Sequence, residues 1–485
     1  MTVHIGTDHH TPSLGAAFFT NRRRWITAVA LILATGAILR CFAITDDFWL
    51  DEIWSLSIAM KAGSAWEVFE MAHDNNHLLN TLFLYVLGPR DDWIPYRCLS
   101  LVCGLGTVVL GFFLGLRWGR VVGLVTGLLF SVSFLMIVYS TEARGYGPAA
   151  FFSLASFFVL ELTLQRQTLA RVLGFGVLVI LGFSSHFTCA AFYIAALAWS
   201  ATRYLQSQIG LRAAIVRWAG LHALPVVYLI ILYLLVLRRL RIGGGPEWTL
   251  GQVVDELMAW SLGYPPGVVP ILLPVLALLA ALAWDSWELR KKGADEWVFH
   301  VFVILLAPIV TLVLLRPDYL FPRYFFVSLG FLFLVLARCI ARIGKRGRAG
   351  AMVALSFVGL FCVGNAFHIG LFLKYGRGNY GDALQYMAEN SQETVVTVAS
   401  DHDFRNQMVV NYHKRFLRSG KEIVYYEQTS FPRQGVHWIL THSQALHPNA
   451  PSFLMLPTGH VYVLRRQFPY YGPSGWHWFV YEKKP

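Results

Sequence analysis

Apolar stretches long enough to cross a lipid bilayer recur along this chain, from Trp25 to Leu373. A membrane-spanning helix needs about 20 consecutive, mostly apolar residues, because each residue advances the helix by only about 1.5 Å. Of the 485 residues, 56% are hydrophobic and 14% are charged, whereas a soluble chain carries about 25% charged residues. The sequence therefore predicts a polytopic α-helical membrane protein.

About eleven membrane spans are predicted from these apolar runs and the polar breaks between them. They cover residues 25–44, 97–116, 121–138, 147–164, 172–185, 187–202, 218–237, 268–286, 297–315, 324–341 and 350–373. The fifth and sixth spans are short, so the count in that region stays open. No small-residue cleavage site follows the first run, which indicates an uncleaved span preceded by a cytoplasmic tail of residues 1–24.

The basic residues between the spans predict the orientation. The net charge is +12, and clusters of Lys and Arg residues recur in one alternating set of short loops. Because cytoplasmic loops are enriched in Lys and Arg, the excess reflects topology and does not indicate a nucleic-acid partner. The opposite, outer side then carries FWLDEIWS (48–55), TEARGYG (141–147), SSHF (184–187) and PRY (322–324). We expect a multi-pass protein of the inner or plasma membrane whose active site faces the periplasmic or outer side.

Two regions fall outside this pattern of spans. The long segment 62–96 mixes apolar and polar residues, which predicts an amphipathic helix lying along the outer interface. Residues 374–485 are polar and predict a small outer α/β domain. Its expected elements are a helix at 382–390 and strands at 393–400, 422–427, 437–442 and 460–466.

Asp51 and Glu52 follow the first span directly. Ionisable residues at a membrane edge are candidates for function, and a carboxylate there could act as a general base on an acceptor hydroxyl or amine. The alternative is an N-cap and first-turn acid for the amphipathic run 53–60. Two further acids, Asp46 and Asp47, weaken any assignment to a single residue.

His73, Asp74 and His77 form a second polar group, in HDNNH. The two histidines have the i, i+4 spacing of helical metal ligands, which leaves a divalent cation open. However, no third strong ligand is nearby, and Asn75 and Asn76 disfavour a continuous helix. We favour a role for His73, Asp74 and His77 as a polar collar that contacts substrate. No cofactor is assigned with certainty, and a divalent cation stays possible.

Arginines complete the outer face. Arg144 follows Glu142 at the end of the third span, and Arg323 precedes Tyr324 at the start of the tenth. A guanidinium donates two parallel hydrogen bonds and so suits a phosphate, although a helix-end ion pair or simple interfacial anchoring would give the same pattern. His186, between the fifth and sixth spans, is either a pocket residue or a core histidine.

The loop after the seventh span also carries basic residues, against the predicted orientation. Arg238, Arg239 and Arg241 precede a run of three glycines. This loop is either a flexible gate over an anionic lipid headgroup or a plain connector.

Six motifs in order resemble the C-type superfamily of membrane glycosyltransferases. The resemblance is to the family 39-like branch, which includes protein O-mannosyltransferases and the lipid A aminoarabinose transferase. The motifs are FWLDEIWS, HDNNHLLNTLFLY, YSTEARGYGPAA, SSHFTCAAF, FPRYFFVSLGFLFLVLA and GNYGDALQYM. Together they extend over most of residues 25–390, whereas residues 391–485 carry no motif of the family.

The resemblance implies a sugar donor linked to a polyprenyl phosphate and an acceptor that is a lipid, a glycan or a protein. Asp51 matches the family's catalytic acid and would be the base, with Glu52 and Glu142 as supporting acids. Arg144, Arg323 and Tyr324 would hold the donor phosphate, and the polar collar with His186 would line the substrate pocket. The acceptor would attack with inversion, and the prenyl chain would lie in a groove between spans.

Two motifs depart from the family's pattern. Leu78 and Leu79 stand where prolines follow the histidine, and Thr141 replaces a glutamine. A transporter of polyprenyl lipids is one rival, but its polar residues would lie near the bilayer midplane within repeats. Another envelope-modifying membrane enzyme, such as an acyl or phosphoethanolamine transferase, is the second rival.

Overall fold

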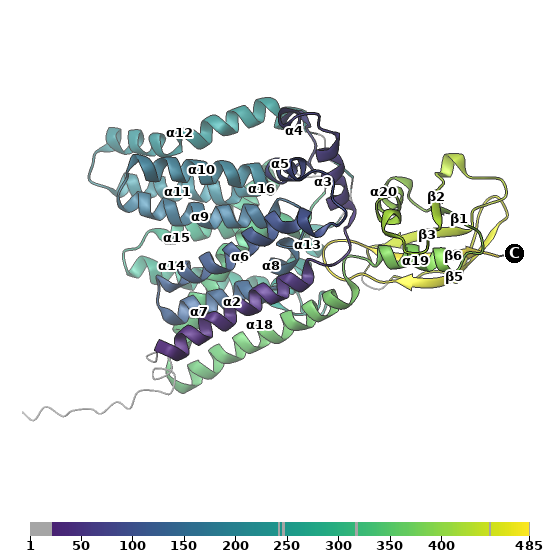
Figure 1. Ribbon diagram of the computed structural model, residues 1–485. Helices are drawn as coiled ribbons and strands as arrows, with labels where there is room; N and C mark the ends of the chain where they lie inside the picture. Colours follow the sequence, from purple (N-terminus) through teal and green to yellow (C-terminus); the bar gives the residue numbers. More distant parts are fainter. Residues whose placement is uncertain (1–21, 241–242, 245–247, 316–318, 446–447, 485) are drawn as a thin grey trace, which may run out of the picture.

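The computed structural model describes residues 22–240, 243–244, 248–315, 319–445 and 448–484. A bundle of long helices is followed by a smaller domain at one end (Figure 1). The bundle helices are α2 (Arg22–Ala43), α6 (Ile94–Leu116), α7 (Arg120–Val132), α8 (Phe134–Tyr139), α9 (Tyr146–Gln165), α10 (Leu169–Ser185), α11 (Cys189–Gln206), α12 (Leu211–Leu235), α13 (Leu250–Leu262), α14 (Leu272–Lys291), α15 (Glu296–Val301), α16 (Ala307–Leu315), α17 (Phe326–Gly344) and α18 (Gly347–Tyr375). Residues 1–21 of the predicted tail and Arg241 of the basic loop lie outside the described residues.

Each predicted span overlaps a helical segment, so the polytopic fold is confirmed. Eight helices of the described chain are long and apolar enough to cross a membrane, and α7 and α10 are shorter apolar helices. The number of spans, eleven, stays a prediction. The predicted span 121–138 is not one helix, because Ser133 is extended and separates α7 from α8. This break leaves the Phe134 N–H free to donate to Asn365 Oδ1 at 2.7 Å.

Three shorter helices, α3 (Leu50–Lys61), α4 (Ala65–Glu70) and α5 (Leu78–Leu87), connect the first two long helices. They lie at the end of the bundle that faces the small domain (Figure 1). The predicted amphipathic segment is therefore two short helices, with a non-helical stretch between Glu70 and Leu78. That break falls on the Asn75–Asn76 pair, where a continuous helix was not expected.

The C-terminal domain is a six-stranded mixed sheet in the order β2-β1-β3-β6-β5-β4. Its elements are α19 (Tyr380–Glu389), β1 (Val395–Ser400), α20 (Asp403–His413), β2 (Glu422–Tyr425), β3 (Trp438–Ser443), β4 (Phe453–Met455), β5 (Val461–Phe468) and β6 (His477–Lys483). The predicted helix and four strands are confirmed, whereas α20, β4 and β6 were not predicted. Strand β6 is central and has five consecutive buried residues, so it shows no alternation of apolar and polar residues.

The two parts share one hydrophobic core. Phe48 and Trp49, from the loop after α2, belong to the same buried cluster as Tyr380, Trp476 and Trp478 of the C-terminal domain. Helix α20 also packs against α3. The loop that leads into α3 and Asp51 is therefore held from both sides, by the bundle and by the C-terminal domain.

Candidate active site

The start of helix α3 positions the Asp51–Glu52 pair. Helix α3 begins at Leu50, with Trp49 as its N-cap in an extended conformation. The Trp49 N–H donates to Glu52 Oε2 at 3.4 Å. Glu52 is therefore the first-turn acid that caps α3, the alternative given above for one of these two acids. Asp51, one residue earlier, projects in another direction and is left for the site.

Two arginines bind the Asp51 carboxylate. Arg144 Nη1 donates to Asp51 Oδ2, and Arg323 Nη1 lies 3.4 Å from the same oxygen. Asn75 ties this group together: its amide donates to the Asp51 carbonyl at 2.9 Å, and its Oδ1 accepts from Arg144 Nη2 at 2.8 Å. Three sequence motifs that lie far apart in the chain thus converge on one carboxylate.

His77 presents a second donor beside Arg144. Its Nδ1 accepts the Gly145 N–H at 2.8 Å, so the neutral ring carries its proton on Nε2. That Nε2 lies 3.2 Å from Arg144 Nη2. Burial, with the positive charge of Arg144 next, lowers the pKa of His77 well below its usual range, so the ring is neutral at pH 7. Two donors facing one place suit an anion.

Gly145 permits this close approach. A Cβ at this position would lie 1.8 Å from the Ser185 carbonyl oxygen and 2.7 Å from His77 Nδ1. No side chain fits there, which explains a glycine directly after Arg144. His186 follows Ser185, and its ring packs against Tyr146 and His77 with centroid distances of 4.3 and 4.7 Å. The structure thus brings His186 into the same group as His77.

Aromatic rings surround the two arginines. Arg144 lies over Tyr146 at 5.1 Å and over Trp49 at 5.9 Å, and Arg323 lies over Phe321 at 4.1 Å. The Nε atoms of both arginines are buried and have no hydrogen-bond partner among the described residues. Tyr324 follows Arg323, and its ring meets Phe321 edge-on. Such packing excludes water and strengthens interactions of the guanidinium groups with an anion.

Glu52 faces away from this group, toward Arg97. The two side chains are fully buried and form two hydrogen bonds, of 2.7 and 2.6 Å. Glu52 Oε1 also accepts the Ala143 N–H at 2.7 Å. Glu52 therefore fixes the loop of Arg144 relative to α3. The roles of Asp51 as base and Glu52 as its support stay predictions. Arg97 was not predicted as a functional residue.

Glu142 also faces away from Asp51. Its carboxylate lies 3.3 Å from the Arg377 Nε, and both side chains are fully buried. Arg377 Nη1 is 3.1 Å from Asp46 Oδ2 as well. Burial raises the pKa of Asp46 to about 6, and the charge of Arg377 opposes that rise. Arg377 was not identified from the sequence, because it is a single basic residue between the end of a long helix and the motif GNYGDALQYM.

His73 and Asp74 form a pair at the edge of the site. His73 Nδ1 lies 2.9 Å from Asp74 Oδ1, and the His73 ring packs on Trp54 at 4.5 Å. Gly243, in the basic loop, lies against both Asp74 and Trp54. That loop therefore reaches the site.

A metal ion does not fit these residues as they stand. Among the described residues, no group of three or more His, Cys, Asp and Glu side chains is placed to hold a metal. The His77 ring uses Nδ1 as an acceptor and carries its proton on Nε2, so neither nitrogen is free to ligate. His73 and Asp74 alone supply two ligands.

Comparison with solved structures places the fold. The chain aligns with the crystal structure of ArnT from Cupriavidus metallidurans in the apo state with a TM-score of 0.51 and 11% identity, covering 86% of this chain and 93% of that one. The chain has the GT-C fold.

Two further GT-C structures, both from Archaeoglobus fulgidus, are more distant. The oligosaccharyltransferase complex with Zn and sulfate aligns with a TM-score of 0.44 and 10% identity over 85% of this chain and 67% of that one. The oligosaccharyltransferase AglB in complex with an inhibitory peptide and a dolichol-phosphate aligns with a TM-score of 0.46 and 10% identity, over 86% and 69%. No protein-family model and no curated protein matches the sequence.

Proposed function

We propose that this protein is a membrane glycosyltransferase that moves a sugar from a polyprenyl-phosphate donor to a lipid, glycan or protein acceptor at the extracytoplasmic face. The GT-C fold supports the class of enzyme, and the site supports the donor. Asp51 would be the base, and Arg144 and Arg323 would hold the donor phosphate. Tyr324, His77 and His186 would line the pocket around them.

The observation that carries this proposal is the charge around Asp51. The buried Arg144 and the mostly buried Arg323 share this one carboxylate, and no other acid among the described residues forms an ion pair with either of them. A net positive charge held away from water is costly unless an anion completes it. The phosphodiester of a polyprenyl-phosphate sugar carries one negative charge, which would balance the group.

Donor binding would also prepare Asp51 for its role. In the ion pair, both arginines occupy the Asp51 carboxylate. A phosphate that takes over their N–H groups would free Asp51 to accept a proton. The two states differ only in which anion the guanidinium groups bind, so the base would become active when the donor is present.

The transfer itself needs one displacement. The acceptor oxygen or nitrogen forms a bond to the anomeric carbon while the bond from that carbon to the phosphate oxygen breaks. The acceptor proton goes to Asp51, and polyprenyl phosphate leaves with an added negative charge. Arg144 and Arg323 stabilise that growing charge. Hydrogen-bond donors aimed at charge that develops in the transition state contribute most to the rate. Attack from the face opposite the phosphate inverts the configuration.

The test is transfer by the purified protein from a panel of polyprenyl-phosphate sugars. We expect Asp51→Asn to lower kcat by about 10²- to 10⁴-fold, the usual contribution of a general base, while the protein stays folded and inserted. Asp91→Asn, a matched change of an exposed acid in the loop before α6, should leave kcat unchanged. Full activity of Asp51→Asn would overturn the assignment of the base, and no transfer from any donor by the wild type would overturn the function.

A further inference from the structure

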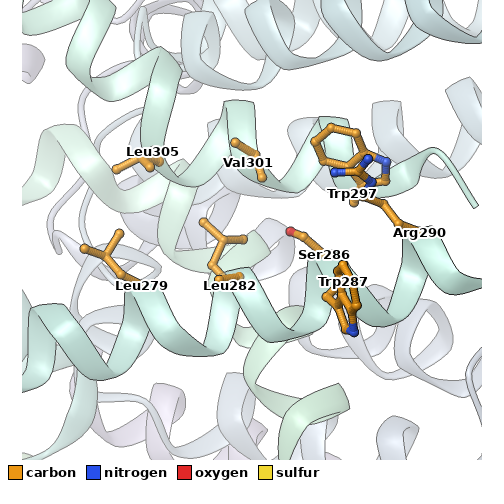
Figure 2. Close-up of a pocket in the computed structure, with 9 residues that line it drawn as sticks. Leu279, Leu282, Ser286, Trp287, Arg290, Trp297, Val301 and Leu305 are labelled. Carbon is orange, nitrogen blue, oxygen red and sulfur yellow. The ribbon is translucent and has the colours of Figure 1, made fainter.

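A second feature lies at the opposite end of the bundle from Asp51. An apolar groove runs between α14 and the helix formed by α15, the π-helical segment Phe302–Leu306 and α16, and has a volume of about 350 Å³. Figure 2 shows Leu279 and Leu282 on one wall, opposite Val301 and Leu305. The groove is open to the outside of the bundle, where Leu279 and neighbouring α14 residues are exposed.

Aromatic and basic side chains close one end of the groove. Arg290 lies over the Trp297 ring at 5.1 Å, and Lys291 lies over Trp287 at 5.1 Å. Lys292 follows, so three consecutive cations end α14. This end is the cytoplasmic one in the predicted orientation. Trp residues with Arg or Lys at a helix end are typical of the headgroup level of a bilayer.

A polar atom with no partner lies inside the same end of the groove. Ser286 is 9% exposed, and its hydroxyl has no hydrogen-bond partner among the described residues. It precedes Arg290 by one helical turn, so both side chains lie on one face of α14. A buried hydroxyl without a partner is unfavourable, and an acceptor supplied by a ligand would satisfy it.

The walls of the groove are fixed from behind. Asp285 accepts hydrogen bonds of 3.0 Å from Arg338 Nε and of 2.5 Å from Arg342 Nη1, which ties α14 to α17. Ser328, also on α17, donates to the Val303 carbonyl at 2.7 Å in the π-helical segment. Such segments are rare and often occur at functional sites. These contacts fix the backbones of α14 and of the π-helical segment that form the two walls of the groove.

We propose that this groove binds an anionic phospholipid of the cytoplasmic leaflet, with one acyl chain between Leu282 and Val301 and the phosphate at Arg290. The apolar walls match a hydrocarbon chain, the Ser286 hydroxyl matches an ester carbonyl one turn deeper, and the cations match the headgroup charge. The donor proposed above is a different ligand, because its phosphate belongs to Arg144 and Arg323 near the other end of the bundle.

Charge decides between a lipid and a second copy of this chain as the occupant. A second copy with the same orientation in the membrane would place its own Arg290, Lys291 and Lys292 beside these three cations, and the like charges would repel. Anionic lipids are the abundant negative charges at that depth, and each Lys or Arg near such a surface contributes a few-fold in affinity. The groove therefore favours a lipid.

The test is native mass spectrometry of the full-length protein released from nanodiscs that contain equal amounts of phosphatidylglycerol and phosphatidylcholine. The readouts are the number and class of phospholipids retained. Leu282→Trp fills the groove, and Leu276→Trp makes the same change at a position of α14 that is 52% exposed. Arg290→Ala removes the headgroup partner, and Arg212→Ala removes an exposed cation at the start of α12.

We expect Leu282→Trp to lose one retained phosphatidylglycerol and Arg290→Ala to lower the preference for phosphatidylglycerol about fivefold, the effect of one cation at such a surface. Both control variants should match the wild type. The proposal is overturned if Leu282→Trp and Arg290→Ala retain lipid like the wild type. It is equally overturned if the retained mass is a polyprenyl phosphate, or if the wild type is a dimer that Leu282→Trp dissociates.

Discussion

The Arg377 guanidinium lies 3.3 Å from the Glu142 carboxylate, although 235 residues separate them in the chain. Glu142 stands two residues before Arg144, and Arg377 stands two residues after the end of α18, where the C-terminal domain begins. Arg377 Nη2 also donates to the Val138 carbonyl at 3.0 Å. The entry to the C-terminal domain and the loop that carries Arg144 are therefore one buried unit.

Arg377→Ala should destabilise the protein and reduce transfer together. Both side chains of the pair are fully buried, so removing the arginine leaves Glu142 as an uncompensated charge, at a cost of about 3–5 kcal/mol. The measurement is thermal unfolding in detergent, followed by kcat for sugar transfer. Lys374→Ala, an exposed cation one turn earlier on α18, is the control and should keep wild-type values. Wild-type unfolding in Arg377→Ala would mean that the domain is held by its aromatic core alone.

Glu52→Gln should lower stability more than Asp51→Asn does. The amide keeps the shape of Glu52 but removes its charge, which leaves the fully buried Arg97 without its carboxylate, at a cost of about 3 kcal/mol. Asp51, with a side chain 16% exposed, has the arginines of the open site as partners. The comparison is the unfolding temperature of the two variants at one pH. Equal losses would show that the two acids are not divided into a supporting and an acting residue.

Arg144→Ala should weaken binding of the donor and spare the acceptor. Loss of charge-assisted hydrogen bonds to a phosphate costs about 1.5–3 kcal/mol, which corresponds to roughly a 10- to 100-fold rise in Kd for polyprenyl phosphate. The Kd can be measured by titration in detergent micelles, and the acceptor KM by transfer. Arg212→Ala, an exposed arginine at the start of α12, is the control. An unchanged Kd would remove Arg144 from the phosphate site.

The parts of the fold that depend on local pattern were predictable from the sequence. Runs of apolar residues located the long helices, and short runs rich in β-branched and aromatic residues located β1, β2, β3 and β5. Strand β6 was not predicted, because a central strand that is buried on both faces shows no alternation of apolar and polar residues. Helix α20 escaped because its residues, DFRNQMVVNYH, have no apolar periodicity, and its buried side depends on contacts with α3.

The residues that meet at the candidate site were predictable from the sequence, but the buried arginines behind it were not. Asp51, Arg144 and Arg323 were identified because acids and arginines at an outer membrane edge are unusual, and the structure brings them together. Arg97 and Arg377 were not identified, because each reads as an ordinary basic residue at a helix end. Their partners, Glu52 and Glu142, lie 45 and 235 residues away, and no local pattern reports an ion pair over such distances.

His413 should make the stability of the protein depend on pH. This histidine of α20 is 2% exposed, and its Nε2 donates to the Phe48 carbonyl at 2.8 Å, in the loop before Asp51. Burial lowers its pKa, although the nearby Asp47 charge opposes this. In the unfolded chain its pKa is about 6.5, so the unfolded form binds a proton first as the pH falls. The stability that neutral His413 contributes is therefore present above about pH 6.5 and is lost below it.

The measurement is the unfolding temperature of the wild type and of His413→Gln between pH 8 and pH 5. Glutamine keeps a donor for Phe48 but does not titrate, so we expect a shallower acid loss in the variant. At pH 5, the free energies of unfolding of the two proteins can differ by at most about 2 kcal/mol through this titration. The limit follows because pH 5 lies about 1.5 units below the unfolded-state pKa of about 6.5. His437→Gln, at a partly exposed histidine of the same domain, should keep the wild-type slope. Parallel curves for wild type and His413→Gln would show that the contact between α20 and the Asp51 loop tolerates a charged imidazole.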